Sequence, residues 1–540
     1  MKKLVSLLLA LLLVLGCAVA EVNTEGYEPI WLGDSPVVIT CAAGSERWTE
    51  NSNPAEMYFF KYAENYLNVK FDVQYYSGDR LNMLYASNEL PDLLLGRGGS
   101  PTQTIMYGAT THQYTDMAPY LTEELTPNIL DFFEKYPDSR AACTCIDGGI
   151  YTLPFLQLRY EDDLSASPNF SYVRTFINTA WLEDMDLEYP ETLDDLLEIL
   201  RAFKTRGDNV VPLSALTSIR YMLWLNFAGS EGFYSQSGPW KPGVTKDGEV
   251  VYGVEHESYV HYLEFLHTCY EEGLVSKDIC TMSNAEAQAL VTEDKAGVYI
   301  DWAPYNAVSD TWNLWDFCGP LVYEAGQEKA IVRNNVYSIG GVAISAKCEY
   351  PEVVMRVLDM LFTPEGQMRY FFGPASTEGD KLLGYKGWTV DESGILHLKE
   401  YLDGDFGSDY EFQINMMGGD ETIGCQIGVY NAIREKLGLE PVNFEWDLTD
   451  PDVFYRYTMA NHTYDYLVNG YPKYVYMSSE DSQELNDIEY AIADVVKAEE
   501  AKFITGARSL DEYDAYIEEL KAMGLDRATE LAAAAYENYK

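Results

Sequence analysis

The stretch that decides the fold class spans residues 37–99 and reads VVITCAAGSERWTENSNPAEMYFFKYAENYLNVKFDVQYYSGDRLNMLYASNELPDLLLGRGG. It opens with an apolar run at residues 37–40, which predicts a buried strand. Asn53 then precedes a helical pattern over residues 54–67 that has proline at its first position, where a helix tolerates it. Over residues 69–75 apolar and polar side chains alternate, which predicts a second, half-buried strand.

A short helix and a third strand continue this pattern. Residues 79–87 predict the helix, and the buried leucines at 93–95 predict the strand. Strands that alternate with helices over about 60 residues indicate a mostly parallel sheet. In such sheets ligands bind beyond the carboxyl ends of the strands. The loops at residues 43–49 and 96–100 are therefore predicted to lie at a ligand-binding edge.

A second section with the same alternation begins near residue 170. Residues 176–177 predict one strand and residues 296–300 predict another. Between them an apolar stripe over residues 193–203 predicts a helix, and Thr192 with Asp195 three residues on resembles a capping box. The chain thus has two α/β sections, which predicts an α/β protein of more than one domain.

Three further elements follow the second section. Residues 336–345 predict a strand, Pro351 begins a helical pattern, and residues 485–540 are helical to the end of the chain. At 540 residues the chain is long enough for roughly three to four domain-sized units. It contains no internal repeat of the kind that would indicate a solenoid or a propeller.

The charge balance excludes several classes of partner. Lys and Arg number 37 and Asp and Glu number 86, so the formal net charge is −49. Binding to nucleic acids or to anionic membrane surfaces requires clustered basic residues. The composition therefore argues against both, while a hydrophobic content of 47% fits a folded globular protein.

The N-terminus predicts export. Lys2 and Lys3 precede an apolar run at residues 4–15, which is the length of a signal-peptide core and shorter than the ~20 residues of a membrane-spanning helix. Two kinds of processing remain open. Cys17 follows Leu and Gly as in a lipoprotein leader, which favours lipidation at Cys17, but cleavage after Ala20 would release a secreted protein. We favour a cell-surface lipoprotein on the outer face of the cytoplasmic membrane.

Motifs for catalysis, cofactors and metals are missing from the sequence. It has no nucleophile elbow, no phosphate-binding loop and no dinucleotide fingerprint. Cys143 and Cys145 lack a second pair at zinc spacing. His256 and His261 are five residues apart, which turns the two rings about 140° from one another on a helix. We therefore expect no catalytic residue, no cofactor and no metal site.

The aromatic residues point to a ligand. Tyr numbers 43 and Trp 10, against 21 Phe. Sugars present apolar C–H faces ringed by hydroxyl groups, so their receptors stack indole or phenol rings on the face and direct polar side chains to the rim. Aromatic side chains are also common in cores, so each assignment is a hypothesis. The candidate ligand-binding residues are Trp48, Arg97, Trp240, Asp301, Trp302, Arg333 and Asn334.

The whole chain resembles a known family. The resemblance is carried, in the family's order, by the leader at Cys17, residues 181–203, residues 296–302, the helix start at residues 350–352 and the ending at residues 502–513. These segments resemble the extracellular solute-binding proteins, family 1, which are lipoprotein receptors of carbohydrate ABC importers in Gram-positive bacteria. The resemblance implies an oligosaccharide ligand, ABC permease subunits as partners, a membrane contact through the lipid anchor only, and a monomer.

The resemblance also implies the architecture. The expected fold is the two-lobed fold of periplasmic binding proteins of the maltose-binding type, with the ligand in a cleft between the lobes. Hinge closure would capture the ligand without chemistry. The expected parts are a leader at 1–20, a tether at 21–35, lobe 1 at 36–155 and 333–370, and lobe 2 at 156–332 and 371–540.

One departure from the family pattern concerns calcium. Longer relatives often carry an acidic calcium-binding loop directly after the helix that matches residues 193–203. Here residues 204–209 read KTRGDN and include one carboxylate. Calcium prefers about 6–8 oxygen ligands, so we expect that site to be missing.

Two other functions remain open. A closing cleft can hold other solutes, so a receptor of the same fold for peptides is possible. An exported glycoside hydrolase would need two carboxylates that face each other across a cleft. With 86 acidic residues, adjacent pairs such as Asp162 and Asp163 are expected by chance and do not identify such a site.

Overall fold

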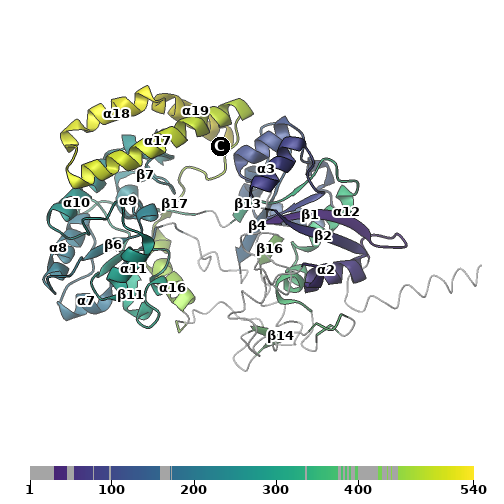
Figure 1. Cartoon of the computed structure of the whole chain (residues 1–540), viewed down its shortest axis with the longest axis horizontal. Helices are drawn as coiled ribbons and strands as arrows, with labels where there is room; N and C mark the ends of the chain where they lie inside the picture. The colour runs from purple at the N-terminus through teal and green to yellow at the C-terminus, as the bar shows by residue number, and fades with distance from the viewer. Residues whose placement is uncertain are drawn as a thin grey trace, which may run out of the picture. The chain divides into compact units, whose positions relative to one another are not determined.

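The computed structural model divides the chain into two compact units. It describes residues 29–540 except 45–53, 77, 97–98, 159–170, 172, 335–336 and most of 375–450. The first unit comprises Met1–Asp162 and Tyr337–Asn443, and the second comprises Asp163–Val336 and Phe444–Lys540 (Figure 1). Along the part of the chain that is described, no helix is both long enough and apolar enough to cross a membrane.

The first unit is built on a six-stranded sheet with the order β16-β4-β13-β3-β1-β2. Its strands are β1 (Val37–Gly44), β2 (Val69–Tyr76), β3 (Leu93–Leu95), β4 (Leu153–Leu158), β13 (Tyr337–Ile344) and β16 (Gly424–Ile427). β1 is parallel to β2 and to β3, which confirms the prediction from residues 37–99. β13 runs antiparallel to β3 and β4.

One boundary differs from the expected division of the chain. The sequence places residues 371–540 in lobe 2, but β16 pairs in parallel with β4, with Gly424 opposite Phe155 and Ile427 opposite Leu158. This pairing joins β16 to the sheet of the first unit. Such long-range pairing leaves no local pattern in the sequence, so the expectation for this strand was wrong.

Short helices flank this sheet. They are α2 (Tyr58–Tyr62), α3 (Gly78–Ser87), α4 (Pro101–Thr104), α5 (Pro127–Lys135), α6 (Pro137–Cys143), α12 (Pro351–Met360) and α13 (Pro364–Gln367). Asp359 of α12 caps α5, because its carboxylate accepts the Ile129 backbone N–H at 2.9 Å and the Asn128 side-chain amide at 2.7 Å. Burial raises the pKa of Asp359, although these hydrogen bonds oppose the rise.

The second unit is built on a four-stranded sheet with the order β11-β5-β10-β6. β6 (Leu213–Ala215) and β10 (Val298–Ile300) are parallel neighbours. β5 (Thr175–Asn178) pairs antiparallel with β10 and with β11 (Trp315–Phe317). The strands predicted at residues 176–177 and 296–300 are therefore confirmed as β5 and β10.

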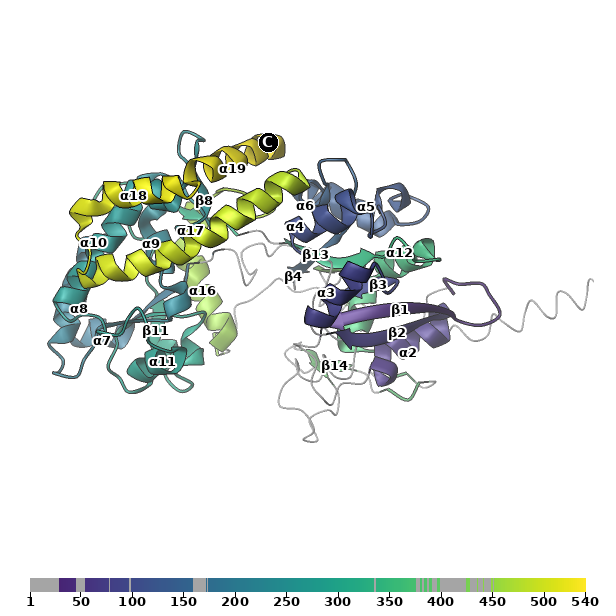
Figure 2. The same ribbon diagram turned by 45° about the horizontal axis from the view of Figure 1, so that its top comes forward.

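Helices cover this second sheet. They are α7 (Thr179–Asp184), α8 (Leu193–Lys204), α9 (Met222–Ala228), α10 (Glu257–Glu271), α11 (Asn284–Thr292), α16 (Pro451–Thr463), α17 (Ser479–Thr505), α18 (Tyr513–Ala522) and α19 (Leu525–Tyr539). The predicted capping box at α8 is present, with the Thr192 hydroxyl accepting the Asp195 N–H at 3.0 Å. α17 lies against α10, and α19 returns alongside α17 (Figures 1 and 2).

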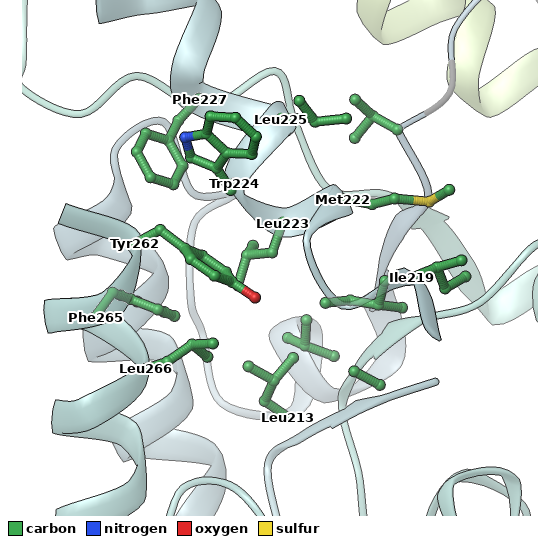
Figure 3. Packing of buried hydrophobic residues seen from close by; sticks show 14 of the residues in the cluster. Leu213, Ile219, Met222, Leu223, Trp224, Leu225, Phe227, Tyr262, Phe265 and Leu266 are labelled. Atoms are coloured by element: carbon green, nitrogen blue, oxygen red, sulfur yellow. The ribbon is translucent and has the colours of Figure 1, made fainter. Parts of the chain in front are cut away.

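Part of the core of the second unit lies between the sheet and helices α9 and α10. Leu213 of β6 faces Leu223 of α9 and Leu266 of α10 (Figure 3). Trp224 is fully buried, and its indole N–H donates to the Ser258 hydroxyl at 2.9 Å. A buried indole needs such an acceptor, so this hydrogen bond fixes α9 against α10.

A buried ion pair joins the connection after β6 to α17. The Arg220 guanidinium donates to Glu500 at 2.5 Å and to the Ile279 carbonyl at 2.8 Å. The second carboxylate oxygen of Glu500 accepts the Tyr259 hydroxyl at 2.7 Å. Burial lowers the pKa of Arg220, but the charge of Glu500, its hydrogen bond and the neighbouring Tyr262 and Cys280 together raise it, and the net shift is upward. These charge-assisted hydrogen bonds fix the connection at the carboxyl end of β6.

Candidate functional site

The candidate site lies at the carboxyl ends of β6 and β10. These strands are parallel neighbours, so the chain leaves both at the same edge of the sheet. Residues 216–221 follow β6 and residues 301–307 follow β10, and the Leu216 N–H donates to the Ile300 carbonyl at 3.0 Å. The edge at which the sequence predicts ligand contacts in this unit therefore carries Asp301 and Trp302.

Asp301 is 1% exposed, and its carboxylate is surrounded by donors. One oxygen accepts the Trp302 backbone N–H at 2.5 Å and the Asn306 amide at 3.3 Å. The other accepts the Tyr299 hydroxyl and the Gln288 amide, the latter at 3.4 Å. Burial is the main cause that raises the pKa of Tyr299, and the charge of Asp301 adds to it. The Tyr299 hydroxyl therefore keeps its proton and donates. Asp301 thus fixes the turn after β10, and its oxygens are already paired within the chain.

Trp302 is 46% exposed although it directly follows a buried strand. Its backbone is held by Asp301, and the short helix η8 (Pro304–Asn306) follows at once. Most large apolar side chains of this unit are buried in its core. An exposed indole on a fixed turn offers a flat apolar surface to a ligand.

Further aromatic side chains stand beside this turn. Tyr305 meets Tyr455 edge to face with ring centroids 5.8 Å apart, and Trp312 meets Phe454 in the same way at 5.2 Å. Tyr455 and Phe454 belong to α16, which packs on this part of the unit. Sequence reasoning missed the two α16 residues because they lie about 150 positions further along the chain, and no local pattern links them to the turn.

Arg333 and Asn334 lie together in a second place in this unit. The Arg333 N–H donates to the Val468 carbonyl at 2.8 Å, its carbonyl accepts the Gln236 amide at 2.8 Å, and its side chain is exposed. Asn334 is 6% exposed. Within the described part of the chain, the side-chain oxygens of Asn334 and Gln236 are both buried without a hydrogen-bond donor. Buried polar atoms are usually paired, so these two acceptors suit donors that a ligand would bring. Sequence analysis missed Gln236, which has no motif around it.

Trp240 is packed on other groups of the second unit. Its ring meets Tyr221 edge to face at 5.6 Å, and the Lys497 ammonium lies 5.0 Å from its centroid. A Cβ atom added at Gly238 would come within 2.7 Å of the ring. The indole is therefore enclosed by its own chain on several sides, unlike Trp302.

Three predicted residues lie outside the described residues. These are Trp48, Arg97 and the lipidation candidate Cys17. Across the described residues, no group of three or more His, Cys, Asp or Glu side chains is placed to hold a metal ion.

The sequence of the whole chain was compared with models of known protein families. The sequence model of the bacterial extracellular solute-binding proteins matches residues 49–368, which is more than half of the chain. The chain belongs to this family. Proteins of the family are extracellular, in agreement with the export that the leader predicts.

Individual relatives are distant but cover most of the chain. The fructooligosaccharide ABC transporter substrate-binding protein FusA of Streptococcus pneumoniae is 22% identical over 507 residues, which are 90% of this chain and 88% of FusA. Lipoprotein LipO of Bacillus subtilis is 24% identical over 306 residues, which are 56% of each chain.

Solved structures show the same fold. A solute-binding protein from Bifidobacterium longum infantis, associated with an ABC transporter and binding human milk oligosaccharides, superposes with a TM-score of 0.74 at 19% identity and covers 94% of this chain and 99% of its own. FusA in complex with kestose superposes with a TM-score of 0.67 at 21% identity and covers 93% and 99%. A structure of an EF-hand mutant of FusA is also similar, with a TM-score of 0.65 at 21% identity, covering 93% and 99%. These likenesses show the two-domain fold of solute-binding proteins.

Proposed function

We propose that the protein is the extracellular receptor of a carbohydrate ABC importer and that it binds an oligosaccharide against Trp302. The observation that carries this proposal is the half-exposed indole on a turn fixed by a buried carboxylate. A rigid aromatic ring at the edge of a sheet is suited to the apolar face of a sugar. The relatives with named ligands, FusA and the Bifidobacterium protein, bind oligosaccharides.

The hydroxyl groups at the rim of the sugar need hydrogen-bond acceptors and donors from the protein. Sugar hydroxyl groups donate hydrogen bonds, and the buried oxygens of Asn334 and Gln236 are acceptors without donors among the described residues. Arg333 precedes Asn334 in the chain and is exposed, and its guanidinium can donate hydrogen bonds to a ligand. We assign these three residues and Trp302 as ligand contacts, and Trp48, Arg97 and Trp240 remain candidates.

The charge of the protein supports a neutral ligand. The formal net charge is −49, and such a field repels anions. An anionic glycan would need several arginines to converge on it, whereas a neutral oligosaccharide needs none. We therefore expect a neutral glycan.

The remaining parts of the proposal concern the membrane and the importer. The order of basic residues, apolar run and Cys17 supports lipid anchoring. Capture by hinge closure and delivery to permease subunits belong to the same proposal, as does the monomeric state. The family membership supports each of them.

Titration calorimetry against a mixed panel tests the ligand class. The panel holds fructooligosaccharides, milk oligosaccharides and N-glycans beside peptides of similar mass. We expect one glycan class to bind with a Kd in the micromolar range or below and the peptides not to bind. Binding of a peptide with no glycan binding would overturn the proposal. Hydrolysis of a chromogenic glycoside, abolished by one Asp or Glu substitution, would also overturn it.

A further inference from the structure

The connection between α8 and β6 is where the family resemblance implies a calcium loop. Lys204 ends α8 and Leu213 begins β6, so residues 205–212 form the connection, eight in all. An EF-hand loop takes about 12 residues and supplies most of about 6–8 oxygen ligands. Here Asp208 is the only carboxylate. The donor set does not fit calcium.

Two cations of the chain occupy this connection instead. The Lys204 ammonium donates to the Val210 carbonyl at 2.6 Å, so it ties the end of α8 to the entry of β6. The Arg206 guanidinium lies 4.4 Å from the centre of the Trp181 ring and 3.3 Å from the Asp184 carboxylate. A guanidinium over an indole is stabilised by the ring's negative face.

Trp181 joins this connection to two other parts of the unit. Its indole N–H donates to Asp294 at 3.0 Å, and its ring meets Phe203 of α8 edge to face at 5.1 Å. Asp294 lies in the turn before β10 and has a positive φ of 56°. A Cβ atom added at Gly297 would come within 2.4 Å of the indole, so the ring packs directly on the backbone there. Helix α7, the α8–β6 connection and the turn before β10 therefore meet at Trp181.

We propose that the Lys204 ammonium and the Arg206 guanidinium replace a bound calcium ion at the α8–β6 connection. The two groups provide positive charge at fixed positions, and they do so without a metal. Neither folding nor ligand binding of this protein then requires a calcium ion at the α8–β6 connection. The proposal rests on this chain's own contacts and does not depend on which solute the protein binds.

The first test uses the wild-type protein. Thermal unfolding is followed with millimolar calcium and with excess EDTA, and terbium luminescence is excited through tryptophan. We expect the same Tm in both solutions and no saturable terbium emission. A calcium-dependent rise in Tm or a terbium signal that Asp208→Asn removes would overturn the proposal.

The second test uses variants that keep the apolar stems. Lys204→Met and Arg206→Met should each lower the Tm by about 2–4 °C, and added calcium should not restore it. Lys246→Met is the matched control, because Lys246 is 72% exposed and pairs at 3.3 Å with an exposed Glu328. Unchanged Tm values for both Lys204→Met and Arg206→Met would overturn the proposal. The wild-type measurement decides the question if a variant fails to fold.

Discussion

Asp301→Asn is the substitution whose effect the structure specifies most closely. Four donors converge on this carboxylate, from Trp302, Asn306, Tyr299 and Gln288, and the side chain is 1% exposed. An asparagine keeps one acceptor oxygen and places an amide, itself a donor, where the other oxygen stood. At least one of the two donor pairs then loses its acceptor.

The magnitude follows from which pair is lost. A buried donor without a partner costs about 1–3 kcal/mol. The Gln288 contact is long at 3.4 Å, so its loss contributes little. Loss of the Tyr299 contact, or of the Trp302 contact at 2.5 Å, contributes most of the effect. We expect the free energy of unfolding to fall by about 2 kcal/mol and the turn that carries Trp302 to loosen.

Two assays read these effects separately. Urea unfolding gives the free energy of unfolding, and titration calorimetry gives the affinity for the glycan found in the panel. We expect the Kd to rise at least about tenfold, which corresponds to about 1.4 kcal/mol. Asp310→Asn is the matched control, because Asp310 lies nearby on the same segment and is exposed. If Asp301→Asn changed neither stability nor Kd beyond the Asp310→Asn control, the positioning role of Asp301 would be refuted.

Two further predictions concern buried charges away from the candidate ligand contacts. Arg220→Met leaves Glu500 buried with one oxygen unpaired, so urea unfolding should show a loss of about 3–5 kcal/mol that Glu500→Gln in the same chain partly restores. A loss below about 1 kcal/mol would contradict this account of the ion pair. Burial raises the pKa of Asp359 above its unfolded value, so its ionisation favours the unfolded state and the free energy of unfolding falls as pH rises through the interval between the two values. Asp359→Asn should flatten the part of the stability profile that lies above the unfolded-state pKa of an aspartate, about 3.9, and an unchanged profile would show that Asp359 does not contribute.

Local patterns in the sequence predicted the elements that local interactions determine. The alternation at residues 69–75 corresponds to β2, and Thr192 with Asp195 forms the predicted capping box. These features depend on residues within a few positions of one another. The pairing of β16 with β4 joins Gly424 to Phe155, and no local pattern in either strand indicates it.

The placement of Asp301 and Trp302 directly after a strand was predictable from the sequence, but the surroundings of each side chain were not. The pair Asp301 and Trp302 was identified from its place after a strand, and both residues lie at the expected edge. The two residues differ because Asn306 and Tyr299 donate to Asp301, whereas Trp302 stays 46% exposed among the described residues. Which donors surround a carboxylate depends on side-chain packing, which a one-dimensional pattern does not contain.

The packing of Trp240 illustrates the same limit. Its neighbour Tyr221 lies within twenty residues, but Lys497 comes from α17 near the end of the chain. The local sequence around a loop tryptophan is therefore the same whether the side chain contacts a ligand or a distant helix. The position of the Gln236 side chain is likewise set by a distant residue, because its amide donates to the backbone carbonyl of Arg333.

The most direct test of the central claim is a calorimetric titration of one glycan into wild-type protein and into Trp302→Ala. Trp302 is 46% exposed and is not part of the core, so its removal should leave the Tm nearly unchanged. We expect at least a tenfold rise in Kd for Trp302→Ala, about 1.4 kcal/mol, with partial retention of affinity in Trp302→Phe. The same Kd for Trp302→Ala and wild type would contradict the claim that the ligand binds against this indole.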